Sequence, residues 1–309
     1  MTQPTIDAGF ARVNELVLAE RLPEALDLLD ALADRASVGG AAVDEARARR
    51  LGAAVARIMG DVPGAILRGQ AVTDAEPDTW RSARIELGEA HALAGDRQAA
   101  AAAWREVLAT PLEPRTRAAV LRKLAGVLGD TENALEALEE AQALARGAGN
   151  AVSAARLAVE SAGLAGAADH PAAEAIARRA RARAQEAGDA VALADLELLA
   201  AARALTDDDP QAALAACARA RKLALQAVAP LQYIGASLAF ARVADAAGER
   251  VQAYESLAVG WVTLADLLGA DAARSVYQPE LERMREQWGA DEFGRARGAY
   301  EARRRAERS

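Results

Sequence analysis

Long stretches with a regular apolar spacing alternate along this chain with short polar turns. The clearest stretch runs from Trp80 to Leu108, with a turn at Gly95-Asp96 and charged residues every few positions on either side. Apolar residues that recur every three or four positions indicate a helix with one buried face. The stretch therefore predicts two antiparallel helices joined by a tight turn.

The same kind of turn recurs along the chain, and an alanine follows it each time in the first turn of the next predicted helix. Successive key alanines are 40, 35, 34, 39, 39 and 41 residues apart. Ala213 fits the sixth repeat almost as well as Ala212, so the register there is open by one residue. Seven helix pairs are predicted, with the key alanines Ala25, Ala65, Ala100, Ala134, Ala173, Ala212 and Ala253. Acidic residues at or near the helix N-termini are expected to cap them, namely Asp61, Asp96, Asp130, Asp169 and Asp208.

Several of these residues resemble the consensus of the tetratricopeptide repeat (TPR). They are Leu87-Gly88, the Gly95-Asp96 turn, Ala100 and the large residue Trp104. Gly88 and Ala100 would let two helices approach closely, while Trp104 and Leu108 fill the space between neighbouring pairs. The resemblance covers about residues 6–268 and implies an all-α fold, a right-handed α-α superhelix of seven helix pairs. Most repeats exceed the usual length of about 34 residues, and they are similar to the extended repeats of bacterial regulators.

The pattern changes after Leu268. Residues 1–268 are predicted to form the TPR-like solenoid and residues 269–309 its C-terminal cap, with helices at 270–288 and 290–308. Pro279 is expected to kink the first of these helices or to lie in its opening turn. Segments 31–40 and 145–150 are expected to be short connectors and not domain boundaries.

Eight of the eleven aromatic residues lie at or beyond Tyr233, and this concentration admits two interpretations. In the first, the aromatic side chains form a cap that packs on the seventh repeat. In the second, Trp288, Phe293 and Tyr300 form a surface for a partner or for a homodimer.

The composition and charge of the chain serve mainly to exclude classes of protein. The net charge is −8, from 37 Lys and Arg against 45 Asp and Glu, which argues against a dedicated nucleic-acid binder. No stretch approaches the roughly 18 apolar residues of a membrane span. The N-terminus has neither the basic nor the apolar region of a signal peptide. We therefore expect a cytoplasmic protein without membrane contact.

Catalytic chemistry has no candidate constellation in this sequence. The two histidines, His91 and His170, lie far apart, and Cys217 is the only cysteine. Phosphate-binding glycine motifs are missing, and the acidic run at 207–209 precedes Pro210 as a helix N-terminus would. The sequence therefore predicts a protein that is not an enzyme and holds no cofactor and no metal.

In TPR arrays the first helix of each pair lines a concave groove, and the resemblance places the partner-binding residues there. The second repeat offers a basic stripe, because Arg47, Arg50 and Arg57 share one helix face. Such a stripe binds carboxylates or phosphates, or is simply a solvated helix face. The other residues expected on the concave face are Glu89, Lys123, Leu238 and Arg242, together with the small residues Ala155, Ala158, Ala162 and Ala165 of the fifth repeat.

Two functions are compatible with these features. The first is a non-enzymatic scaffold or adaptor that binds a protein or peptide in its concave groove. The second is a sensory module that binds a signalling peptide or a small ligand, as the extended repeats of bacterial regulators suggest.

Overall fold

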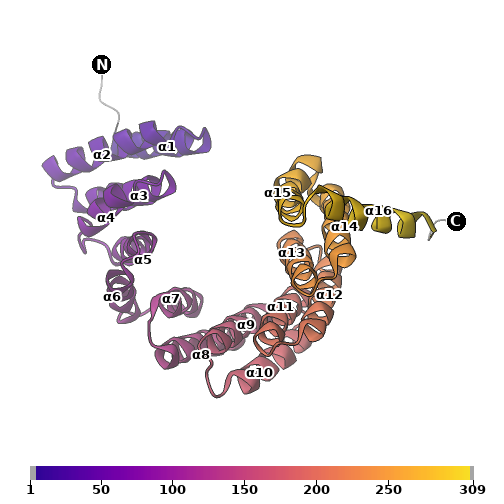
Figure 1. The fold of residues 1–309 in the computed structure, drawn as a ribbon. Helices are drawn as coiled ribbons and strands as arrows, with labels where there is room; N and C mark the ends of the chain where they lie inside the picture. Colours follow the sequence, from indigo (N-terminus) through magenta and orange to yellow (C-terminus); the bar gives the residue numbers. More distant parts are fainter. Residues whose placement is uncertain (1–4, 307–309) are drawn as a thin grey trace. The chain divides into compact units, whose positions relative to one another are not determined.

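The computed structural model describes residues 5–306, and these residues form sixteen α-helices without a strand (Figure 1). The chain divides into two compact units after Ala148, and each unit is described by itself. The predicted all-α fold is confirmed, with seven helix pairs followed by two more helices. The first unit contains α1 (Ile6–Leu18), α2 (Leu22–Val38), α3 (Ala42–Ile58), α4 (Val62–Gln70), α5 (Pro77–Leu93), α6 (Arg97–Leu108), α7 (Pro114–Val127) and α8 (Thr131–Gly147). The second contains α9 (Ala151–Ala167), α10 (Ala173–Glu186), α11 (Ala190–Thr206), α12 (Pro210–Gln226), α13 (Pro230–Ala246), α14 (Arg250–Leu268), α15 (Ala270–Trp288) and α16 (Ala290–Ala306).

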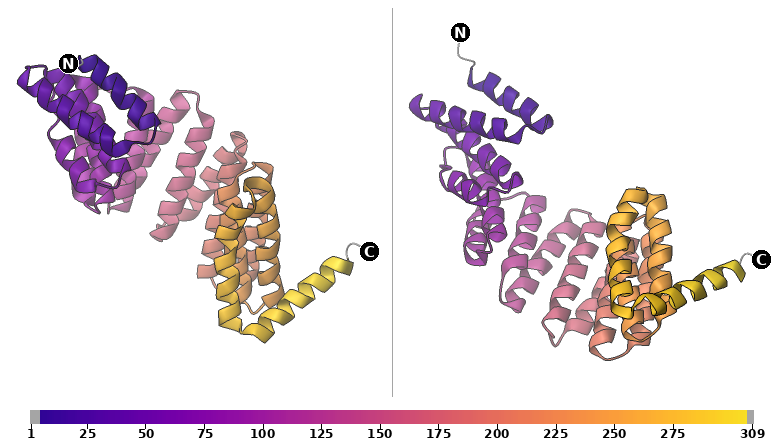
Figure 2. Two further views of the ribbon diagram at one scale, coloured as in Figure 1. Left: turned by 90° about the horizontal axis from the view of Figure 1, so that it is seen from above. Right: turned by 45° about the horizontal axis from the view of Figure 1, so that its top comes forward.

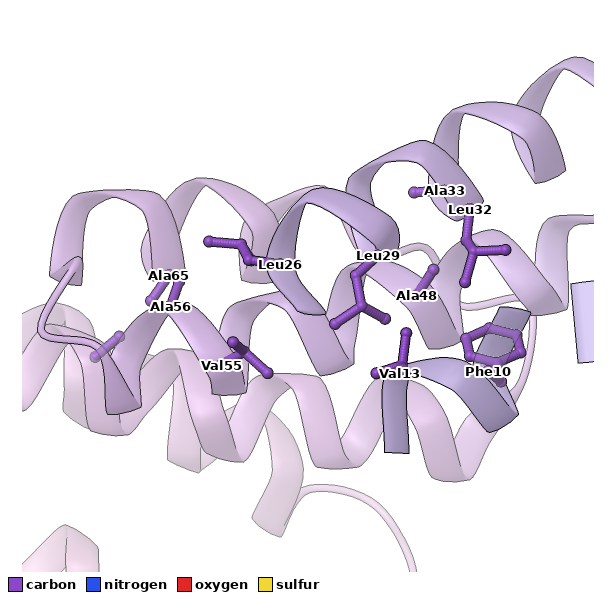
Figure 3. Packing of buried hydrophobic residues seen from close by; sticks show 11 residues of the cluster. Phe10, Val13, Leu26, Leu29, Leu32, Ala33, Ala48, Val55, Ala56 and Ala65 are labelled. Atoms are coloured by element: carbon purple, nitrogen blue, oxygen red, sulfur yellow. The ribbon is translucent and has the colours of Figure 1, made fainter. Parts of the chain in front are cut away.

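The core of the first unit lies between helices that follow one another in the chain. Each helix packs against the next as a hairpin, and the first helices α3 and α5 also lie side by side. Figure 3 shows Phe10 and Val13 of α1 gathered with Leu29 and Leu32 of α2 between the helices. Burial of such side chains contributes about 1.5–3 kcal/mol each, so the hairpins depend on their neighbours for stability.

Gly88 and Trp104 pack as the repeat consensus implies. A Cβ atom at Gly88 would lie 2.3 Å from Nε1 of Trp104, so only glycine allows this contact between α5 and α6. The indole Nε1 donates a hydrogen bond to the carbonyl oxygen of Ile85 at 3.1 Å. The two interactions fix the closest approach of the pair.

The turns confirm some of the predicted caps and correct others. Asp61, Asp96 and Asp130 cap α4, α6 and α8, and each accepts a backbone N–H bond. Asp169 and Asp208 do not cap, because they adopt left-handed φ angles of 47° and 57°, as glycine does in several of the other turns. Asp tolerates this conformation better than most residues.

This difference resolves the register of the sixth repeat. Because Asp208 occupies the left-handed position, Asp209 becomes the cap of α12 and accepts from the N–H of Ala212 at 2.9 Å. Ala213 is fully buried, whereas Ala212 is exposed. The key alanine is therefore Ala213. The six other predicted key alanines are buried.

The two predicted connectors differ from the loops that the structure shows. Helix α2 continues through Val38, so the prediction of a connector from residue 31 is wrong. Helix α8 likewise continues through Gly147, so the connector expected at 145–150 is reduced to residues 148–150, where the division between the two compact units falls.

In the second unit, buried carboxylates connect successive helices. Glu197 of α11 is nearly buried, and it pairs with Arg181 of α10 and Arg219 of α12 at 2.6 and 2.7 Å. Asp245 of α13 accepts a hydrogen bond from Nε1 of Trp288 at 2.8 Å and pairs with Arg250. These contacts tie α15 to the end of the seventh repeat.

The last two helices begin and end close to their predicted limits. Helix α15 spans Ala270–Trp288 as expected, and Pro279 lies inside it; the predicted end of α16 at Arg308 lies outside the described residues. A single glycine joins α14 to α15, and another joins α15 to α16. These residues, Gly269 and Gly289, have φ angles of 95° and 82°, which residues other than glycine rarely adopt. Figure 2 shows α16, in yellow, leaving the antiparallel helices before it so that its second half projects from them.

Candidate functional site

An ion-pair ladder joins the first helices of three consecutive repeats in the first unit. Arg57 of α3 pairs with Glu86 and Glu89 of α5, with nitrogen–oxygen distances of 2.9 and 3.2 Å. Glu89 also pairs with Lys123 of α7. Arg57, Glu89 and Lys123 were all predicted on the partner face, and the structure brings these three side chains together.

The ladder carries no net charge, because two cations face two carboxylates. Its side chains keep between 22% and 38% of their exposure, so solvent or a ligand can reach them. Ion pairs this exposed contribute little net stability, on the order of 0–1 kcal/mol each. They can therefore exchange partners at low cost.

The rest of the basic stripe is less neutralised. The Arg47 guanidinium lies over the ring of Phe10 at 4.2 Å from its centroid, and Arg49 pairs with Glu45 at 2.8 Å. Neither Arg47 nor Arg50 makes an ion pair with a carboxylate in the part of the chain that the structure describes. These two guanidinium groups remain available for an anionic group of a partner.

Exposed apolar residues end three of the first helices, and sequence reasoning missed these residues, which we call the apolar row. Leu18, Ile58 and Leu93 end the first helices of three repeats and are 86%, 62% and 63% exposed. Ile58 follows Arg57 directly, and Leu93 lies one turn after Glu89. A signal was present, because each residue stands seven positions before a key alanine.

We call this combined surface of the first unit the first-helix face. It consists of Arg47 and Arg50, the ladder, and the apolar row. Glu86 was also missed, and only its position three residues before Glu89 on the same helix face could have indicated it. The face thus combines cations, paired carboxylates and exposed apolar groups.

The predicted residues of the second unit have other surroundings. Arg242 of α13 pairs with Glu280 of α15 at 2.5 Å, and Leu238 packs against the core of α13, α14 and α15. Burial opposes ionisation of Glu280, but hydrogen bonds from Arg242 and Arg283 hold its pKa below the ordinary value. Arg242 and Leu238 therefore lie together near the end of the repeats.

The prediction that small residues of the fifth repeat line a groove is wrong. The four alanines of α9 that were expected to face the groove are buried, and three of them belong to a cluster with α10 and α11. Alanine at these positions allows close helix packing and leaves no open surface. The residues are Ala155, Ala158, Ala162 and Ala165.

The C-terminal aromatic residues face the seventh repeat. Tyr254 of α14 makes edge contacts with Phe293 and Tyr300 of α16, at centroid distances of 5.4 and 5.7 Å. Trp288 and Phe293 pack on the core of α13–α15, and Tyr300 is buried. Their contacts are those of a cap, while a partner surface or homodimer at these residues stays a prediction.

A cleft of about 460 Å³ lies between α14, α15 and the second half of α16. Its floor is formed by Ala258, Trp261 and Val262 of α14 and by Leu281 of α15. Two tyrosines, Tyr254 and Tyr300, also line the cleft, and charged residues at the end of α16 form its rim. Burial raises the pKa of Tyr254 above its ordinary value, so its hydroxyl stays protonated at neutral pH.

The described residues contain neither a candidate metal site nor a candidate membrane span. No group of three or more His, Cys, Asp or Glu side chains is placed to hold a metal ion. Within residues 5–306, every helix is too short or too polar to cross a membrane. His170 accepts the backbone N–H of Ala172 at Nδ1, a structural contact at the start of α10.

Three solved structures show the same fold at low sequence identity. Apo RapI is 11% identical, with a TM-score of 0.55 over 98% of this chain and 99% of that one. A Rap protein in complex with Competence and Sporulation Factor is 13% identical, with a TM-score of 0.53 over 97% and 87%. BtubC (BKLC) from P. vanneervenii is 16% identical, with a TM-score of 0.50 over 69% and 92%.

These similarities establish a TPR-like helical repeat fold, which confirms the resemblance found in the sequence. No protein-family model matches the chain, and no curated protein matches it either.

Proposed function

We propose that this protein is a non-enzymatic scaffold or adaptor that binds a protein or peptide on the first-helix face. The observation that carries the proposal is the coincidence of three features on the first helices of the first unit: two cations without ion pairs, the ladder and the apolar row. Exposed apolar groups beside polar ones mark interaction surfaces more often than isolated apolar residues do.

The chemistry of the face indicates what the partner carries. Leu18, Ile58 and Leu93 recur once per repeat, so a segment lying across the first helices would meet an apolar contact at each. Arg47 and Arg50 would bind a carboxylate of the same segment. The partner is therefore an amphipathic segment with acidic and apolar side chains.

The solved neighbours support a binding role. One Rap protein with this fold was solved in complex with Competence and Sporulation Factor. That complex also gives a specific reason to keep the second function, a sensory module for a signalling peptide or small ligand. A sensor would gain thermal stability from a low-molecular-mass fraction of its host, because ligand binding stabilises the folded state. A scaffold would gain it only from the protein fraction.

Site-specific photo-crosslinking tests the location. A photoreactive phenylalanine at Ile58 or at Leu93 should capture the same partner in cells. The control position is Leu67 of α4, which is 69% exposed but lies on a second helix. Capture from Leu67 and not from the first-helix positions would contradict the proposal.

A charge reversal tests the cations. Arg47→Glu with Arg50→Glu should weaken binding of the captured partner by about tenfold or more, since two charge-assisted contacts are replaced by repulsion. The matched control is Arg105→Glu with Arg115→Glu, which changes the charge equally at two exposed arginines elsewhere in the first unit. Equal binding by both double variants would show that the basic stripe has no part in recognition.

A further inference from the structure

The cleft between α14, α15 and α16 is separate from the first-helix face and belongs to the second unit. Four residues of α14 form one stripe along it, namely Tyr254, Ala258, Trp261 and Val262. Helix α16 covers this stripe only in part, because its last buried residue is Tyr300 and residues 301–306 are exposed. Val262 keeps 46% of its exposure. An apolar surface therefore remains open beside the projecting end of α16.

Some charged side chains at the rim of the cleft are paired and others are not. Arg303 turns to Glu255 of α14 and pairs with it. Glu301, the carboxylate of the cleft, is already paired with Arg297 at 2.7 Å. Arg304 and Arg305 line the cleft but have no carboxylate within ion-pair distance among the described residues.

A helix dipole explains part of this arrangement and not all of it. Arginines in the last turn of a helix interact favourably with the carbonyl end of its dipole. The dipole does not account for the apolar stripe of α14 that lines the same cleft. Pockets that bind small groups combine such an apolar lining with a few polar groups, and they have volumes of roughly 300–1,000 Å³.

We propose that this cleft binds a short acidic peptide segment of a partner protein, with an aromatic or aliphatic side chain on the α14 stripe and carboxylates on Arg304 and Arg305. The occupant follows from charge complementarity, because the two guanidinium groups favour an anion and the apolar floor favours an apolar group. The volume suits one large side chain and its neighbours, so a single anchor with flanking acids fits better than a long helix. This site does not depend on the first-helix face.

The probe is a displayed library of random dodecapeptides, selected on the full chain. Peptides that bind the cleft should carry Asp or Glu beside an aromatic or aliphatic residue. In fluorescence polarisation, Arg304→Glu with Arg305→Glu should weaken them about tenfold or more. Val262→Asp should weaken them as well, since it places a carboxylate on the floor. Arg304→Lys with Arg305→Lys should retain most of the binding, because the charge is kept.

The matched control reverses two adjacent exposed arginines of α10, Arg178→Glu with Arg179→Glu, at the same total charge. Circular dichroism of each variant verifies that it is folded. Selected peptides that bind the wild type and the α16 double variant equally would overturn the proposal. So would sedimentation with vesicles of phosphatidylcholine and phosphatidylglycerol that depends on the α16 arginines, or a dimer that the same variant dissociates. A failure here leaves crosslinking at Ile58 unaffected, so the two sites are tested separately.

Discussion

Gly88 is the position where a single methyl group should disturb the first unit most clearly. In Gly88→Ala the new Cβ would lie 2.3, 2.6 and 2.7 Å from three atoms of the Trp104 indole. The ring cannot simply swing away, because it is 3% exposed and donates to the carbonyl of Ile85. The α5–α6 pair must separate or the indole must leave its place.

The magnitude follows from three effects. Overpacking a core by one carbon costs about 1–3 kcal/mol. Loss of the indole hydrogen bond costs about 1 kcal/mol more. Alanine in a helix offsets about 1 kcal/mol of this, because it is a better helix former than glycine. We therefore expect Gly88→Ala to lower the free energy of unfolding by about 2 kcal/mol. In a unit of this size, Tm should fall by about 4–8 °C.

The assay compares Gly88→Ala with Gly126→Ala in α7. A Cβ at Gly126 meets nothing within 4 Å, so this variant should be unchanged or up to about 1 kcal/mol more stable. Urea denaturation followed by circular dichroism gives both values, and hydrogen exchange should rise in α5 and α6 of the first variant only. If both glycine variants shift stability in the same direction by similar amounts, the close-approach argument is refuted.

Three further variants or reactions test the second unit. Glu197→Ala should lower the free energy of unfolding by about 2 kcal/mol, because Arg181 and Arg219 lose a buried acceptor and a cavity forms; urea denaturation measures this. Burial raises the pKa of Asp195, so its contribution to stability is complete below the ordinary pKa of about 3.9 and is lost as the pH rises through the raised value. Asp195→Asn should therefore be more stable than the wild type at pH 7 and lose that advantage toward acid, and an advantage that grows in acid would contradict the assignment. Burial raises the pKa of Cys217 to about 11, so at pH 8 its thiol should react with a disulfide reagent only after unfolding, and fast reaction of the folded protein would contradict this.

The repeat architecture could be predicted because each repeat restates the same local chemistry. A polar turn followed by a small residue is a short-range signal. It located six of the seven key alanines, all of which are buried. The open register at the sixth repeat has a local cause. Aspartate can cap a helix or take the left-handed turn position, and the sequence Asp207-Asp208-Asp209 does not show which residue does which.

The candidate site was only partly predictable, because it depends on contacts between repeats. Repeat register placed Arg57, Glu89 and Lys123 on one face, and the structure joins them in one ladder. It could not show that Glu86 completes the ladder, since that depends on side-chain rotamers across two helices. The alanines of α9 were misassigned because small residues occur both in grooves and in tight helix contacts.

The one-residue joint before α16 makes the direction of that helix unusually simple to alter. The φ angle of 82° and ψ angle of 160° at Gly289 lie in a region that side chains forbid. Replacing this residue by any other would force the backbone to a different angle, and the whole of α16 would point elsewhere. A change at one hinge-like position would therefore open or abolish the wall of the cleft without altering any residue that lines it.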